Sequence, residues 1–222
     1  MILRRSRVIP SDITVGDDLA LLQAWRRGDR DAGSRLLRRH LGTIYGFFST
    51  KVGPEAAEEL TQRTFETCVE TRDQIYEDVG VRAYLLGIAR NKLLQHHDEW
   101  RRRGSKAVAP GESLAGHGPT ASSIVAQGDQ QRLVLRALAR LPLDFQVAVE
   151  LFYWESLSIT EIAHVLGVPS GTVKSRLARA RRALEQALGE LAAEPRLVET
   201  TIRDLERWIA SMRRHVGADD AS

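Results

Sequence analysis

The outward-facing side chains of residues 170–182 have the types and spacing that suit contact with DNA. Lysine and arginine recur there at successive turns of an expected helix, with small hydroxyl side chains beside them: Ser170, Thr172, Lys174, Ser175, Arg176 and Arg179. Cationic side chains at this spacing can reach phosphates and guanine edges in a major groove, and the small side chains let the helix approach closely. The segment is therefore a candidate DNA-binding helix.

The residues that flank this segment predict a helix, a tight turn and a second helix. Thr160 is expected to cap the first helix, and Gly167 to end it. Pro169 cannot continue a helix, and Ser170 is expected to cap the next one. Apolar side chains that should turn inward from the two helices are Ile162, Ala163, Val165, Leu166, Val173 and Leu177.

A structural helical hairpin with a solvated basic face is the alternative to a DNA-binding helix-turn-helix. It accounts for the charge of residues 170–182, but it gives no reason for Gly167, Pro169 and Ser170 to stand where they do. The order of these three residues therefore favours the helix-turn-helix.

Composition agrees with an intracellular DNA partner. The net charge is only +3 over 222 residues, so the basic residues matter through local clusters rather than through their total. Cys68 is the single cysteine, which excludes a disulfide framework or a cysteine zinc site. No apolar run approaches the ~18 residues that span a bilayer, and residues 1–12 lack the apolar core of a signal peptide. We expect a cytoplasmic protein.

No group of residues has the spacing of a catalytic site or a metal site. His96 and His97 are adjacent, so on a helix they point about 100 degrees apart and cannot easily share a metal ion. The sequence contains neither a glycine-rich phosphate loop nor a GxSxG motif. We expect no enzyme activity, no cofactor and no metal.

A segment rich in Gly, Pro, Ser and Ala, residues 104–123, divides the chain. It is almost uncharged and has no periodic apolar residues, as is typical of a flexible linker. An ordered loop within one domain is the alternative, but such long loops are uncommon in compact domains. The sequence predicts an all-α protein: a flexible N-terminus (1–16), two small helical domains (17–103 and 127–190) joined by a linker (104–126), and a C-terminal helical extension (191–222). Helices in the first domain are expected over 17–27, 31–51, 54–72 and 81–103.

Three segments of this chain resemble the extracytoplasmic-function (ECF) sigma factors, promoter-recognition subunits of bacterial RNA polymerase. They are EAAEELTQRTFETCV at 55–69, RAYLLGIARNKLLQHHDEWRRR at 82–103, and LPLDFQVAVELFYWESLSITEIAHVLGVPSGTVKSRLARARRAL at 141–184. The third is the most specific, and the three occur in the family's usual order. The resemblance implies two helical domains, core RNA polymerase and promoter DNA as partners, and an anti-sigma factor as a regulator.

The resemblance implies a core-polymerase surface on the helix that begins at Pro54. Its expected residues are Glu58, Glu59, Leu60, Gln62 and Phe65, with acids and Gln at the rim and Leu and Phe at the centre. Such a mixture suits a protein interface. For Glu55, a solvated acid at a helix start is an alternative, and Arg63 departs from the family pattern, which often has an acid there.

The resemblance also implies recognition and melting of the minus-ten element by the helix over 81–103. The expected DNA contacts are Gln74, Tyr76, Arg82, Tyr84, Arg90, Asn91, Lys92 and His96, with Gln74, Ile75 and Tyr76 as walls of a pocket for a flipped base. Cations that track a backbone and pockets for extruded bases hold single strands. A position in the core is the alternative for Tyr76 and Tyr84, and Gln95 departs from the aspartate that the family often has at its position.

The candidate residues on the basic helix over 170–182 would then read the minus-35 element. A free-standing repressor or activator with a similar helix-turn-helix is the alternative function. It leaves the matches at 55–69 and 82–103 unexplained, because these would need to form a sensor or dimerisation domain.

Overall fold

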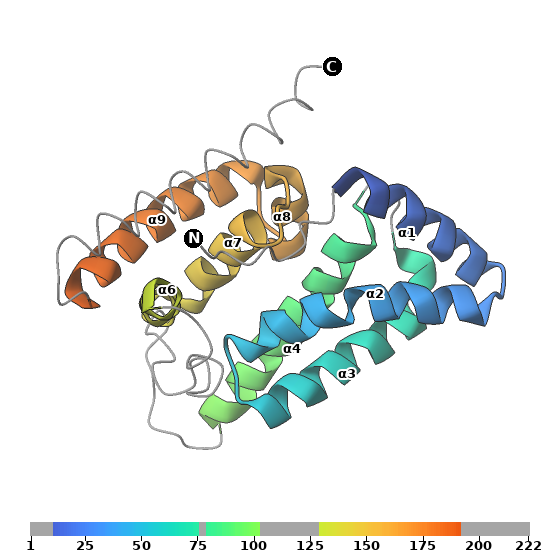
Figure 1. Ribbon diagram of the computed structural model, residues 1–222, viewed down its shortest axis with the longest axis horizontal. Coiled ribbons are helices and arrows are strands. Elements are labelled where there is room, and N and C mark those ends of the chain that lie inside the picture. Colours follow the sequence, from blue (N-terminus) through green and yellow to red (C-terminus); the bar gives the residue numbers. More distant parts are fainter. Residues whose placement is uncertain (1–10, 76–78, 103–128, 192–222) are drawn as a thin grey trace, which may run out of the picture.

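The computed structural model describes residues 11–75, 79–102 and 129–191, and no strand occurs in these ranges. This agrees with the expected all-α class. The elements, in chain order, are α1 (Ser11–Arg26), α2 (Arg30–Ser49), α3 (Pro54–Glu70), the short 3-10 helix η1 (Arg72–Gln74), α4 (Val81–Arg102), α6 (Asp129–Leu138), α7 (Leu143–Tyr153), α8 (Ile159–Leu166) and α9 (Ser170–Leu191) (Figure 1).

Helices α1 to α4 form an N-terminal bundle. The Asp29 carboxylate accepts a hydrogen bond from the backbone N–H of Ala32 at 2.9 Å and so caps α2. Pro54 stands in the first turn of α3, where a helix needs no intrahelical N–H donor. The amphipathic faces then meet in a core whose largest fully buried side chains include Phe47, Phe48, Leu22, Leu36, Ile44, Leu60, Leu85, Leu86 and Leu93.

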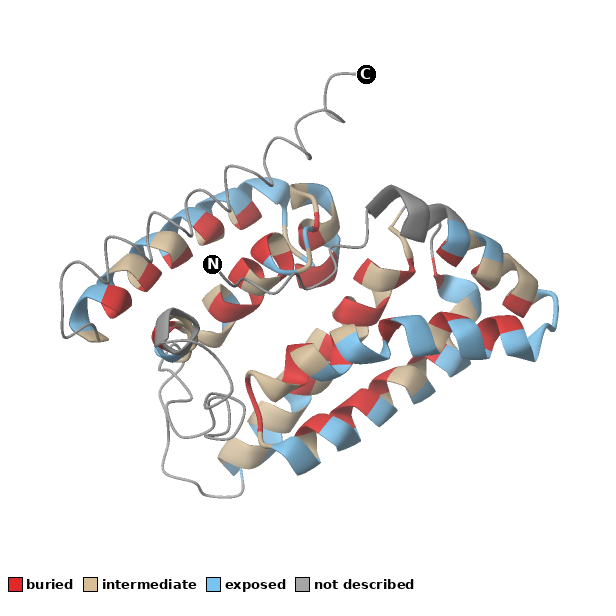
Figure 2. Ribbon diagram, in the orientation of Figure 1, coloured by how far each residue is buried: buried red, intermediate tan, exposed pale blue. Residues whose placement is uncertain are grey.

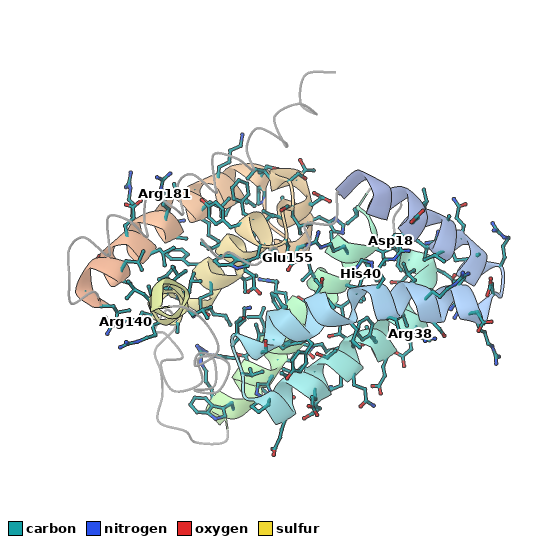
Figure 3. All side chains as sticks on the ribbon, in the orientation of Figure 1. Asp18, Arg38, His40, Arg140, Glu155 and Arg181 are labelled. Carbon is teal, nitrogen blue, oxygen red and sulfur yellow. The ribbon has the colours of Figure 1, made fainter. Side chains whose placement is uncertain are left out.

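A buried polar contact ties α1 to α2. Asp18 and His40 are 7% and 4% exposed, and their Oδ2 and Nε2 atoms lie 2.7 Å apart (Figure 3). Arg39 Nη1 donates to the other oxygen of Asp18, also at 2.7 Å. Because buried polar groups are costly without partners, this shared carboxylate fixes how α1 lies on α2.

The expected helix boundaries are close to the observed ones, with one difference at the N-terminus. α1 begins at Ser11 rather than at Asp17, so the stretch expected to be a flexible N-terminus (1–16) overlaps the first helix. The linker expected over 104–126, the extension expected over 191–222 beyond Leu191, and Tyr76 lie outside the described residues.

Helices α6 to α9 form a C-terminal bundle that contains the expected helix-turn-helix. Ser158, not Thr160, caps α8: its hydroxyl accepts from the Glu161 N–H, and the Glu161 carboxylate accepts from the Ser158 N–H. This reciprocal arrangement, a capping box, gives hydrogen-bond partners to the backbone N–H groups of both Ser158 and Glu161. The cap expected at Thr160 is therefore wrong. Gly167 ends α8 in the left-handed conformation with φ 64°, as expected for a helix stop.

The start of α9 differs slightly from the expectation. The carbonyl of Pro169 accepts the first helical hydrogen bonds, from the N–H groups of Thr172 and Val173. Ser170 is the first helical residue and not the cap. Val173 and Leu177 turn into the core as predicted.

The two bundles pack directly against each other. One continuous cluster of buried apolar side chains contains residues of both, among them Leu85, Leu86, Ala89 and Leu93 of α4 and Ile162, Val165 and Leu166 of α8. Both bundles accordingly carry buried residues, α4 and α8 among their helices (Figure 2). The sequence indicates two separate domains but contains no local signal for this contact between them.

Candidate nucleic-acid interface

The outer face of α9 carries most of the residues expected to contact DNA. Lys174, Ser175 and Arg179 are exposed, Ser170 is exposed at the helix start, and Thr172 is half-buried. Ser175 Oγ donates to the carbonyl of Thr172 at 3.0 Å, and Arg179 Nε to that of Ser175 at 3.4 Å. The Arg179 side chain therefore lies along the helix, and both Lys174 and Arg179 remain exposed to solvent.

Arg176 does not lie on that exposed face, contrary to the expectation. Its side chain is 15% exposed, and Nη2 lies 3.5 Å from the Asp144 carboxylate of α7. Its Nη1 is buried and has no hydrogen-bond partner among the described residues. Arg176 lies one helical turn after Thr172, which is itself half-buried. Both side chains therefore share the face of α9 that turns toward the bundle.

The polar face of α4 places its expected DNA contacts in different surroundings. Asn91 is exposed, and Lys92 and His96 are half-buried. Arg82, in the first turn, donates from Nε to the Glu155 carboxylate at 2.9 Å, with a second contact from Nη2. Burial lowers the pKa of Arg90; nearby Asp144 opposes this shift, and Arg176 adds to it.

Tyr84 of α4 forms a hydrogen bond to the end of α3. It is half-buried, and its hydroxyl donates to Thr71 Oγ1 at 2.8 Å. Tyr84 is expected either to contact minus-ten DNA or to belong to the core. This hydrogen bond favours the structural role.

The loop after α3 is held by an arginine that sequence reasoning missed. Arg26 donates to the carbonyls of Arg72, Asp73 and Ile75. Gln74 remains exposed, but Ile75 is only 2% exposed, so the expectation that Ile75 forms a wall of a base pocket is wrong. No local pattern could identify Arg26, because its partners lie 46 to 49 residues away.

Of the residues expected at a core-polymerase surface on α3, all except the central leucine are exposed or half-buried. Glu58, Glu59 and Gln62 are exposed and Phe65 is half-buried. Leu60 is 1% exposed, so the expectation that it faces a partner is wrong. Leu60 shares the inner face of α3 with Ala57, Thr61, Thr64 and Cys68, and the periodicity of α3 alone could have placed it there.

A buried ion pair between the bundles was also missed. Lys51, at the end of α2, pairs with Glu150 of α7. Burial lowers the pKa of Lys51 and raises that of Glu150, and each charge opposes the shift of the other. Such a pair costs desolvation on both sides, so its net contribution to stability is small, whereas removal of one partner leaves an uncompensated buried charge.

The described residues show neither a metal-ligand cluster nor a helix that could span a membrane. No group of three or more potential metal ligands occurs within 11–75, 79–102 and 129–191. No helix in the same ranges is long and apolar enough to cross a membrane.

Comparisons with known proteins agree with this geometry. A family model described as Sigma-70, region 4, matches residues 131–184. The chain is 35% identical over 175 residues to the ECF RNA polymerase sigma factor SigM of Mycobacterium tuberculosis, covering 78% of this chain and 86% of that protein. It is 30% identical over 174 residues to the ECF RNA polymerase sigma factor BldN of Streptomyces coelicolor, covering 77% of this chain and 65% of that protein.

Two solved structures share the fold. The sigma factor RpoE of Bartonella quintana, in complex with the anti-sigma factor NepR, matches 72% of this chain and 98% of its own, with a TM-score of 0.57 and 22% identity. CnrH, in complex with the cytosolic domain of CnrY, matches 79% of this chain and 99% of its own, with a TM-score of 0.58 and 22% identity.

Proposed function

We infer that this chain, which belongs to the ECF family of RNA polymerase sigma factors, binds core RNA polymerase and directs initiation at specific promoters. The observation that carries this proposal is the α8–α9 helix-turn-helix. Gly167 ends α8 at the turn, and α9 presents Lys174, Ser175 and Arg179 to solvent. This geometry suits insertion of α9 into the major groove of the minus-35 element. Because the polymerase supplies the chemistry, the chain needs no catalytic site of its own. It would act where the polymerase works, in the cytoplasm.

The exposed residues of α3 are the proposed contact with core polymerase. Glu58, Glu59 and Gln62 surround half-buried Phe65, which gives a polar rim around a small apolar centre. Arg63 Nη1 lies 3.4 Å from the Glu59 carboxylate, so the basic residue that departs from the family pattern partly neutralises this rim. The surface is accordingly less acidic than the carboxylates of Glu58 and Glu59 alone would make it.

The polar face of α4 is the proposed site of minus-ten recognition and strand opening. Near the middle of the helix, Asn91 is exposed and Lys92 is half-buried. Replacing both by alanine should preserve closed-complex binding and slow strand opening, because these side chains would hold the unpaired strand. Permanganate reactivity of unpaired thymines measures this, and an unchanged rate and extent of opening would refute the assignment.

An anti-sigma factor is the proposed regulator. One of the two structures described above contains a sigma factor bound to an anti-sigma factor, and the other contains CnrH bound to the cytosolic domain of CnrY. We extend that mode of regulation to this chain, while the identity of the partner is left to affinity capture from the source bacterium.

Binding to core polymerase tests the proposal. The chain should associate weakly with promoter DNA alone and strongly with core enzyme, whereas a free-standing repressor would bind its operator unaided. Changing Glu58 and Glu59 together to Lys should abolish co-purification with core polymerase and leave the helical signal intact. Glu190→Lys, at an exposed acid on α9, is the control. Full assembly and transcription by the charge-reversed protein would show that α3 is not the docking surface.

A further inference from the structure

Helix α1 carries none of the residues expected to contact DNA, yet its last residue holds a segment that does. Arg26 donates to three backbone carbonyls within residues 72–75, and this segment includes Gln74, an expected minus-ten contact. We propose that Arg26 is a positioning residue for minus-ten recognition, which fixes the backbone of residues 72–75 and thereby sets the base that Gln74 selects. This inference rests on the proposed function, because it concerns how that function chooses its DNA.

The guanidinium of Arg26 gathers the carbonyls of the short turn after α3. Its Nη2 atom lies 3.2 Å from the carbonyl oxygen of Arg72, 3.4 Å from that of Asp73 and 2.5 Å from that of Ile75. The last carbonyls of a helical turn have few backbone partners of their own, and a charged donor binds them more strongly than a neutral one. Arg26 therefore defines the path of the backbone between η1 and Ile75.

The neighbouring residue of α1 supports the same segment. Trp25 is 8% exposed, and the guanidinium carbon of Arg72 lies 5.8 Å from the centre of its ring, within the range of a cation–π contact. The indole also covers the backbone of α2, since a Cβ atom added at Gly33 would lie 2.6 Å from its ring atoms. The last turn of α1 is thus fixed on α2 on one side and holds residues 72–75 on the other.

The segment is tied at its other end to α4. The Tyr84 hydroxyl donates to Thr71 Oγ1 at 2.8 Å, and Ile75 is only 2% exposed. Within this frame the side chain of Gln74 stays exposed. Its amide can both donate and accept hydrogen bonds, as the edge of an unpaired base requires. A polar side chain on a fixed backbone can discriminate among bases because its donor and acceptor keep one position.

A positioning role predicts a specific change when Arg26 is lost. Gln74 would then lose its fixed position, so the preferred base would lose affinity while the other bases lose little. Phosphate contacts, by contrast, add affinity for all sequences alike and make it depend on salt. Because the donors of Arg26 already hold carbonyls of the chain, its loss should relax base selectivity and leave the salt dependence of DNA binding unchanged.

Transcription from promoter libraries tests this with the full chain and core polymerase. A fragment that the parent holoenzyme transcribes is randomised in its minus-ten element or, separately, in its minus-35 element, and the transcribed sequences are counted. Arg26→Met removes the donors and keeps an unbranched side chain. Its preference at one minus-ten position should fall by about fivefold to tenfold, with the minus-35 preference unchanged. Arg27→Met, at the exposed neighbour, is the control and should match the parent in both libraries.

Two further variants separate positioning from a general loss of structure. Arg26→Lys keeps the charge and fewer donors, so its preference should be intermediate. Gln74→Ala should lose the same preference, and adding Arg26→Met to it should cause no further loss, because both changes act through one contact. An additive further loss in this double variant would overturn the proposal.

The two libraries also show which result would overturn the proposal. A parent-like minus-ten preference in Arg26→Met would do so, as would an equal fall of its minus-35 preference. If circular dichroism shows that Arg26→Met does not fold, Arg26→Lys decides, and an unchanged minus-ten preference in that variant overturns the proposal. Failure of the parent to direct transcription from any fragment would instead contradict the proposed function.

Discussion

Replacing Glu150 by glutamine should destabilise the protein far more than its single lost charge suggests. Lys51 is 3% exposed, and its Nζ also donates to the Phe47 carbonyl at 2.6 Å and to Thr50 Oγ1 at 3.0 Å. It lies 4.0 Å from the centre of the Phe47 ring. The Glu150→Gln change leaves this ammonium group buried with only neutral acceptors in direct contact.

The expected magnitude follows from these contacts. Removing one partner of a buried ion pair costs about 3–5 kcal/mol. The two remaining acceptors of Lys51 favour the lower end, about 3 kcal/mol, which corresponds to a fall of roughly 6–12 °C in melting temperature for a chain of this size. The double variant Lys51→Met with Glu150→Leu removes both charges, so its free energy of unfolding should lie within about 1 kcal/mol of the parent or above it.

The assay is guanidinium denaturation followed by circular dichroism, at several pH values. Because burial lowers the pKa of Lys51 from its ordinary 10.5, the unfolded chain binds more protons between the two pKa values. The free energy of unfolding of Glu150→Gln should therefore recover as pH rises toward 10.5. The exposed-pair control Glu190→Gln should lose at most about 1 kcal/mol. Equal losses in the single and double variants, or a loss in Glu150→Gln no larger than in the control, would refute this reasoning.

Three further predictions concern single residues. Lys174→Ala should weaken binding to all duplex sequences alike and flatten the salt dependence by about 0.9; fluorescence anisotropy at several salt concentrations checks this, and a sequence-selective loss would count against a phosphate contact. Gly167→Ala should cost about 1–2 kcal/mol through its left-handed φ of 64° alone, since nothing lies within 4 Å of the added Cβ, and Gly167→Asn should cost less; thermal melting compares them. Cys68, whose thiol pKa is raised to about 12 by burial, should resist iodoacetamide at pH 8 in the native chain and react after denaturation, as mass spectrometry would show.

The helices and the turn of the helix-turn-helix were predictable because their signals are local. Gly167 and Pro169 mark the turn, and the inward spacing of Val173 and Leu177 follows from the helical period. The cap at Ser158 was missed in favour of Thr160, although Glu161 three residues later is the partner that a capping box requires. The spacing of Ser158 and Glu161 is thus a local signal for this cap.

The contacts between the bundles could not be predicted in the same way. Lys51 and Glu150 are 99 residues apart, and Arg82 and Glu155 are 73 apart. Helical periodicity separates an apolar face from a polar one, but it does not show which polar residue will meet a distant helix. Helical spacing alone therefore predicts Arg176 on the outer face of α9, whereas its position toward α7 depends on Asp144.

In vitro transcription with core polymerase tests promoter-directed initiation most directly. Genomic fragments of the source bacterium would be transcribed by core enzyme with and without the chain, and the start sites mapped by sequencing. The chain should produce new transcripts whose start sites share minus-ten and minus-35 elements, and the Glu58 and Glu59 double change to Lys should abolish them. The absence of chain-dependent transcripts, together with tight binding of the chain alone to one of these fragments, would contradict the assignment as a sigma factor.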